Sequence, residues 1–317
     1  MTIKEEYQAS LKSMDTEEWL DLRFYRPLGF MWAKFFQRLH VSPNVVTIAS
    51  IFLGIAGGVL LYFRQPGLIW LNYLGFFLII WANTYDSADG QLARLTKQYS
   101  RIGRILDGLS GDLWFLAIYF ALTLREIHFG DAWPGDWFST HSWVIWILAW
   151  TAGLHHASQA SMADYYRQFH LFFVNGKKGS ELESSEQLRE QAKSLTWGND
   201  FWGRLTMPFY INYTRQQESN TPNMQRLRAA LKQKYGDDTV PQEFAEWFRA
   251  QSLPLMKYTN ILSFNTRIIA MFISVIIDMP WLYFAFEIIV LNVLLIYMNR
   301  THERICAQAL QLLTPIS

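Results

Sequence analysis

Long apolar blocks constrain this chain more than any other feature. Of 317 residues, 51% are hydrophobic and only 17% are charged, and the apolar residues gather in blocks long enough to cross the ~30 Å hydrocarbon core of a bilayer. Six such blocks span residues 45–63, 68–85, 102–124, 143–163, 261–277 and 281–298. Because helices satisfy their own backbone groups in lipid, we expect an all-α, polytopic integral membrane protein with six transmembrane helices.

Between the blocks, the chain divides into four expected parts. Residues 1–42 form an N-terminus in which 18–39, rich in both aromatic and basic residues, should be an interfacial amphipathic helix. Residues 43–166 carry the first four spans, with Pro43 at a helix start. Residues 167–257 are too long for a turn and show helical patterns at 185–193 and 223–234, so we expect a helical cytoplasmic insert. Residues 258–317 hold the last two spans and a tail.

The distribution of basic residues predicts the orientation. Lys and Arg are frequent in the N-terminal segment and in the connections around residues 97–104 and 167–178, which by the positive-inside tendency puts both termini on the cytoplasmic side. The first residues lack the apolar stretch of a cleavable signal peptide, and the lone Cys306 excludes an intrachain disulfide. The net charge of +1 is uninformative by itself, and no nucleic-acid partner is expected.

A run of acids and small residues lies where the second and third blocks meet. It reads D-S-A-D-G-Q-L-A-R over 86–94, then eight residues, then G-R-I-L-D over 103–107. At about 100° per residue, Asp86, Asp89 and Gly90 share one helix face. Carboxylates in a membrane segment cost about 2.5 to 3.5 kcal/mol each, so this run needs a cation or a water-filled cavity, and we interpret it as a metal site.

The residue types favour a hard cation beside a phosphate substrate. No histidine or cysteine stands at ligand spacing in the run, and oxygen ligands suit Mg²⁺ or Mn²⁺. The glycines let a pyrophosphate approach the backbone closely. The alternative of another class is a cation transporter or channel with an acidic gate, but such a path needs neither the small residues nor Arg94, and the chain shows no internal repeat.

These residues resemble a known pattern, D-x2-D-G-x2-A-R-x8-G-x3-D-x3-D, the signature of CDP-alcohol phosphotransferases (the CDP-alcohol phosphatidyltransferase family). Pro43-Asn44-x-x-Thr47 also resembles a motif of that family. The resemblance implies a six-span membrane enzyme of phospholipid biosynthesis that moves a phosphoalcohol from a CDP-alcohol to an acceptor alcohol and releases CMP. It further implies two Mg²⁺ or Mn²⁺ ions and a homodimer. The distribution of basic residues places the acidic run, and with it the active site, on the cytoplasmic side (of the inner membrane in a bacterium).

The resemblance also implies roles for individual residues. The metal ligands would be Asp86, Asp89, Asp107 and Asp112, and the nucleotide site would comprise Asn44, Thr47, Gly90, Ala93, Arg94 and Gly103. One position departs from the pattern, because Gly111 stands where the last aspartate, the catalytic base, is expected. Asp112 would point about 140° away from Asp107 on a regular helix, so its assignment as the base requires a π-type turn between them. Otherwise another group is the base, or the protein is an inactive lipid-binding scaffold.

Several alternatives stay open at this point. The CDP-alcohol is expected to be CDP-diacylglycerol with an inositol or polyol phosphate acceptor; the alternative is transfer from CDP-ethanolamine or CDP-choline to diacylglycerol or ceramide. His156 and Arg167 share a face of the fourth span that either receives the acceptor or makes interhelical hydrogen bonds. Arg101 and Arg104 either bind an acceptor phosphate or lipid head groups, or serve only to orient the chain.

Overall fold

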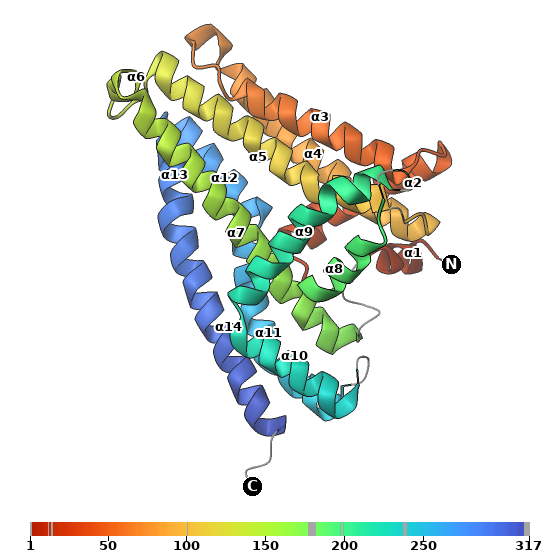
Figure 1. Cartoon of the computed structure of the whole chain (residues 1–317). Helices are drawn as coiled ribbons and strands as arrows, with labels where there is room; N and C mark the ends of the chain where they lie inside the picture. The colour runs from red at the N-terminus through yellow and green to blue at the C-terminus, as the bar shows by residue number, and fades with distance from the viewer. Residues whose placement is uncertain are drawn as a thin grey trace. The chain divides into compact units, whose positions relative to one another are not determined.

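A computed structural model describes residues 2–11, 13, 15–99, 101–176, 182–196, 198, 200–236 and 240–313. All regular secondary structure within these residues is helical (Figure 1), which confirms the all-α prediction. Four helical segments are long and apolar enough to cross a membrane: Pro43–Leu60, Pro66–Thr96, Gln242–Ile276 and Trp281–Leu313. The other two expected spans fall in two long helices, Arg101–Phe129 (α5) and Ser142–Asn175 (α7).

The chain forms two compact units. The first comprises residues 1–157 and 265–290, and the second comprises 158–264 and 291–317. The first unit contains α5 and the part of α7 up to residue 157. It also contains α1 (Ile3–Ser10), η1 (Asp21–Tyr25), α2 (Arg26–Arg38), α3 (Pro43–Leu60), η2 (Pro66–Leu68), α4 (Trp70–Thr96), α6 (Trp137–Thr140), α12 (Phe264–Ile276) except its first residue, α13 (Trp281–Phe286) and η4 (Glu287–Leu291) except its last residue. The second contains the end of α7, α8 (Ser185–Lys193), α9 (Phe201–Ser219), α10 (Pro222–Tyr235), α11 (Gln242–Ile261) and α14 (Asn292–Leu313).

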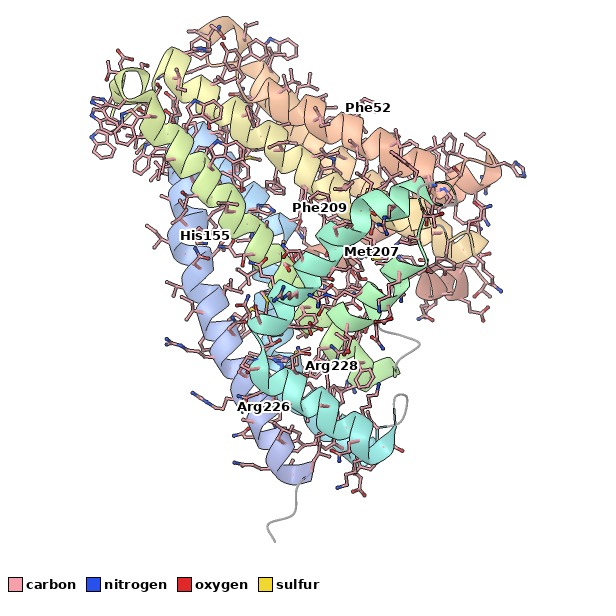
Figure 2. All side chains as sticks on the ribbon, in the orientation of Figure 1. Phe52, His155, Met207, Phe209, Arg226 and Arg228 are labelled. Atoms are coloured by element: carbon pink, nitrogen blue, oxygen red, sulfur yellow. The ribbon has the colours of Figure 1, made fainter. Side chains whose placement is uncertain are left out.

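Glycines bring α3 into backbone contact with both of its neighbours. A Cβ added at Gly57 would lie 2.7 Å from the carbonyl oxygen of Gly75 on α4, and one at Gly58 would lie 3.0 Å from the backbone nitrogen of Ile118 on α5. Small residues permit such close approach of membrane helices. The opposite face of α3 is apolar and uncovered: Phe52, labelled in Figure 2, is 69% exposed. This close packing fixes the positions of α4 and α5 against α3.

A network of ion pairs and hydrogen bonds holds one end of these helices together. The Arg64 guanidinium binds both carboxylate oxygens of Asp278, with its Nε 2.9 and 2.8 Å away. The fully buried Arg125 donates to Asp278 Oδ1 at 2.9 Å and to Asn72 Oδ1 at 2.7 Å. The turn between α12 and α13 is therefore held against α4 and α5.

At the other end, the N-terminal segment packs on α4. The helix expected over 18–39 is present as the π-helical turn η1 followed by α2. A Cβ at Gly29 would lie 2.8 Å from the Ser87 hydroxyl oxygen, so α2 meets α4 within the acidic run itself. The prediction that α3 starts at Pro43 is confirmed.

In the second unit, the helices predicted at 185–193 and 223–234 are confirmed as α8 and α10. Glu303 of α14 caps α10, because its carboxylate accepts from the backbone nitrogens of Asn223 (2.7 Å) and Met224 (3.2 Å). Met224 and Leu227 are fully buried. α10 is therefore packed against α14 within the second unit.

Candidate metal and nucleotide site

Three aspartates from two helices form an acidic trio. Asp86 and Asp89 lie one turn apart on α4, and Asp107 lies on the second turn of α5. One carboxylate oxygen of each lies within 4.8 Å of those of the other two. Burial is graded across the trio, since Asp89 is buried, Asp86 is half-buried and Asp107 is exposed. The Asp107 side of the trio therefore lies at the surface of the protein.

Hydroxyl groups orient two of these carboxylates. The Ser110 hydroxyl lies 2.7 Å from Asp86 Oδ1, and the Thr47 hydroxyl donates to Asp89 Oδ2 at 2.5 Å. Thr47 is 3% exposed, so its role in this structure is to position Asp89. The sequence pattern did not single out Ser110; its only signal was its place one turn after Asp107 on the same helix.

The trio fits a hard divalent cation. Two oxygens that bind one Mg²⁺ at about 2.1 Å each are at most about 4.2 Å apart, so oxygens within 4.8 Å of one another need only small rotations to share an ion. All three groups are carboxylates, the ligand type that Mg²⁺ and Mn²⁺ prefer. Hydrogen bonds that orient ligating carboxylates are a usual feature of such sites, and Thr47 and Ser110 provide them.

Gly90 leaves bare backbone beside the trio. A Cβ at Gly90 would meet only the Arg94 guanidinium, at 3.5 Å or more, so packing within the protein does not require glycine here. The surface is therefore available to a ligand. Ala93 is half-buried one turn further on, and the Arg94 Nε donates to the carbonyl oxygen of Ser10, which ties α4 to the end of α1.

The remaining predicted nucleotide residues flank this surface. Asn44 lies one turn before Thr47 on α3, and Gly103 lies one turn before Asp107 on α5; both are half-buried. The side chains of Arg101 and Arg104 lie outside the described residues. Of the predicted site residues, the structure thus groups Asp86, Asp89, Asp107 and Thr47 directly.

Arg26 brings a positive charge to the trio from outside the sequence motif. Its Nη1 donates to the Ser87 hydroxyl at 3.2 Å, and its Nε binds Glu17 at 2.9 Å. Burial lowers the pKa of the Arg26 guanidinium, but the carboxylates of Glu17, Asp21 and Asp86 together outweigh this effect, so the pKa is raised. Asp86 also acts on Arg26 electrostatically. No spacing in the sequence signalled this residue, which precedes Asp86 by 60 positions.

Asp112 does not join the trio. Residues 107–112 are α-helical within α5, so the predicted π-type turn was wrong: glycines at 108 and 111 permit such a turn but do not enforce it. A regular helix directs Asp112 about 140° away from Asp107. There it lines a mostly apolar cavity of about 250 Å³ between α5 and α7, together with Trp150 and His156. The assignment of Asp112 as metal ligand and base therefore lacks the geometry it needs.

His156 belongs to a buried hydrogen-bond cluster. Its Nδ1 lies 3.0 Å from the Tyr119 hydroxyl and 3.1 Å from Arg267 Nη1. Arg267 Nη1 also donates to Glu287 Oε1 at 2.6 Å, and the Tyr283 hydroxyl donates to the same oxygen at 2.5 Å. Tyr119 donates to the other oxygen of Glu287. Of the two readings left open, interhelical hydrogen bonding is the one seen here.

Arg167 is likewise engaged within its own unit. Its Nε donates to the Thr259 hydroxyl at 3.2 Å, and its Nη2 donates to the Thr259 carbonyl oxygen at 3.1 Å. It thereby ties α7 to the end of α11, which is a structural contact.

Comparison with known proteins shows which protein family the region around the trio resembles. The family model for CDP-alcohol phosphatidyltransferases matches residues 40–168, which include α3, α4, α5 and all three aspartates. Residues 40–168 thus match a CDP-alcohol phosphatidyltransferase domain. Enzymes of this family transfer a phosphoalcohol from a CDP-alcohol and are generally dependent on divalent metal ions.

Two curated relatives are similar to part of this chain. An uncharacterized CDP-alcohol phosphatidyltransferase class-I family protein of Dictyostelium discoideum is 25% identical over 135 residues, 41% of this chain and 32% of that protein. An uncharacterized protein of Aquifex aeolicus (strain VF5) is 29% identical over 108 residues, 34% of this chain and 52% of that protein. The chain thus spans about a third and about half of the lengths of these relatives.

Proposed function

We propose that this protein transfers a phosphoalcohol from a membrane-accessible CDP-alcohol to an acceptor alcohol and releases CMP. The observation that carries the proposal is the convergence of Asp86, Asp89 and Asp107 within 4.8 Å beside the bare backbone of Gly90. In the reaction, the acceptor oxygen forms a bond to the phosphorus that bears the alcohol, the bond from that phosphorus to CMP breaks, and the hydroxyl proton is released.

Each group of site residues has its own role in this reaction. Asp86, Asp89 and Asp107 would hold Mg²⁺ or Mn²⁺, which supplies charge neutralisation for the pyrophosphate. Thr47 and Ser110 keep two of the carboxylates in place. Gly90 lets the nucleotide lie against α4. Since positioning and neutralisation provide most of the catalysis in phosphoryl transfer, this arrangement suffices without a covalent intermediate.

We place the trio on the cytoplasmic side of the membrane. The support is the excess of Lys and Arg in the N-terminal segment and in the connection between α4 and α5. Cysteines introduced at exposed Gln98 and at exposed Trp133, in a background that lacks Cys306, would test the orientation. Labelling of position 98 only from the cytoplasmic side is expected, and labelling only from the outside would invert the topology.

The test of function uses the full-length protein in lipid nanodiscs. CMP release is measured with CDP-diacylglycerol and, separately, with CDP-ethanolamine and CDP-choline, each with a panel of acceptors, in Mn²⁺ and after EDTA treatment. The proposal expects CMP release with at least one pair, loss on chelation, and a phosphodiester product of matching mass. Ion flux in liposomes without CMP release would instead favour a transporter.

A further inference from the structure

One face of α4 is hydrogen-bonded to the N-terminal segment. The Ser87 hydroxyl accepts from Arg26 Nη1 at 3.2 Å, and Gln91 Nε2 donates to the Arg26 carbonyl oxygen at 3.1 Å. One turn further on, Arg94 Nε donates to the carbonyl oxygen of Ser10, the last residue of α1. Residues 87, 91 and 94 are spaced i, i+4 and i+7, so they share one face of the helix.

The Arg94 guanidinium reaches from this face to the surface beside the trio. A Cβ at Gly90 would lie 3.5 Å from both Nη1 and Nη2 of Arg94, and Gly90 shares its face of α4 with Asp86 and Asp89. The Ser10 carbonyl oxygen takes the Nε at 2.5 Å, whereas Nη1 and Nη2 make no hydrogen bond to a described residue. The two Nη groups form the edge of an arginine that binds a phosphate through two parallel hydrogen bonds.

Side-chain contacts hold α1 against α2. Glu6 Oε2 pairs with Lys34 Nζ at 3.1 Å, and the Tyr7 ring packs edge-on against Phe30 with the ring centroids 5.4 Å apart. Ser10 is fully buried, and its hydroxyl donates to the Tyr7 carbonyl oxygen at 2.6 Å. These contacts fix the position of the last carbonyl group of α1.

Arg94 needs such an anchor to keep its orientation. An arginine side chain has many rotamers and loses this freedom when it is ordered. The positive charge of Arg26 also acts on Arg94 and repels it. The Ser10 carbonyl oxygen holds the guanidinium beside Gly90 against both effects.

We propose that α1 is a positioning element of the nucleotide site, which holds the Arg94 guanidinium, through the Ser10 carbonyl oxygen, with its Nη edge toward the pyrophosphate of the CDP-alcohol. This role rests on the proposed function for the identity of the anion. The family match begins at residue 40, so the anchor of Arg94 comes from outside the matched segment.

The experiment measures the kinetics of CMP release by the full-length protein in nanodiscs. The variant Glu6→Lys/Tyr7→Ala removes both of these side-chain contacts between α1 and α2. We expect it to raise the KM for the CDP-alcohol about tenfold, the effect of losing a hydrogen bond to a charged group, while the KM for the acceptor changes less than about threefold. The matched control Lys4→Ala/Gln8→Ala changes two exposed residues of the same helix and should leave both KM values at wild type.

A double-mutant cycle with Arg94→Ala separates positioning from general support of the fold. Arg94→Ala should itself raise the KM for the CDP-alcohol at least about tenfold. Adding Glu6→Lys/Tyr7→Ala should then have no further effect, because α1 acts through the Arg94 side chain. Additive effects, an equal rise in the KM values of both substrates, or wild-type KM values in the α1 variant or in Arg94→Ala would overturn the positioning role and leave the proposed function intact.

If no substrate pair releases CMP, the proposed function fails, and nucleotide binding still decides the role of α1. Calorimetric titration of CDP into the Mn²⁺-loaded protein should then show binding to the wild type that is about tenfold weaker in Glu6→Lys/Tyr7→Ala. Equal affinities of the two proteins, or no binding to the wild type, would overturn the positioning role as well.

Discussion

Carboxylates in two regions of the first unit differ in how their negative charge is compensated. Glu287, fully buried, receives hydrogen bonds from Arg267, Tyr283 and Tyr119, so the protein itself compensates its charge. Asp86 and Asp89 receive hydrogen bonds from neutral hydroxyls and lie beside a third carboxylate. The first arrangement stabilises helix packing, whereas the second leaves negative charge for a cation to bind.

The largest expected effect is at the trio. Asp86→Asn, Asp89→Asn and Asp107→Asn should each lower the rate of CMP release about 10³-fold, as expected when a principal source of electrostatic stabilisation is removed. The yield of folded protein should stay near wild type, because removal of one carboxylate relieves repulsion within the trio. CMP release assays with size-exclusion profiles check both. Wild-type turnover in all three variants would remove the metal site from the account.

At Glu287 the same chemical change should act on stability. Glu287→Gln leaves Arg267 buried with its charge uncompensated, and the free energy of unfolding should fall by about 3 to 5 kcal/mol, as on breaking a buried ion pair. Thermal and denaturant unfolding in detergent measure this, with exposed Glu186→Gln as the matched control. An unfolding free energy equal to that of the control would show that the cluster does not support the fold.

A smaller effect is expected at the hydroxyl that orients Asp89. Thr47→Val preserves shape but removes the hydrogen bond to Asp89, and loss of such an orienting bond typically costs about 10- to 100-fold in metal affinity or activity. We expect a rise of about tenfold in the Mn²⁺ concentration for half-maximal rate. Thr47→Ser should restore the wild-type value; an equal defect in both variants would point to packing instead.

The smallest effect is expected at Asp112. Because it faces the cavity between α5 and α7 and lies outside the trio, Asp112→Asn should change kcat less than about threefold, the range of substitutions away from a site. A loss of about 10²-fold, the contribution of a positioned general base, would restore Asp112 as the base and imply a rearrangement of α5.

Local spacing predicted the parts of the site that depend on one helix at a time. Asp86 and Asp89 had to share a face of any helix that formed there. The position of Asp112 was not predictable in this way, since a π-type turn depends on what surrounds α5. The count of six spans is also not confirmed, because four segments of the described residues meet the length and composition of a span.

Contacts between distant segments were beyond the reach of the sequence. Asn265 meets Glu18 and Asp21 across 247 and 244 residues, and Glu287 meets His156 and Tyr119 across 131 and 168. No local sequence pattern marks any of these residues. Their contacts are set by the packing of α12 and η4 in the first unit. Long-range polar contacts of this kind follow from the fold rather than from any motif.

Calorimetric titration of Mn²⁺ into the full-length protein tests the central claim most directly, because it reads the metal site without requiring a substrate. We expect wild type and Asp112→Asn to bind Mn²⁺ with affinities within about threefold of each other, and Asp89→Asn to bind at least about tenfold more weakly. Retention of wild-type affinity in Asp89→Asn, with loss in Asp112→Asn, would contradict it.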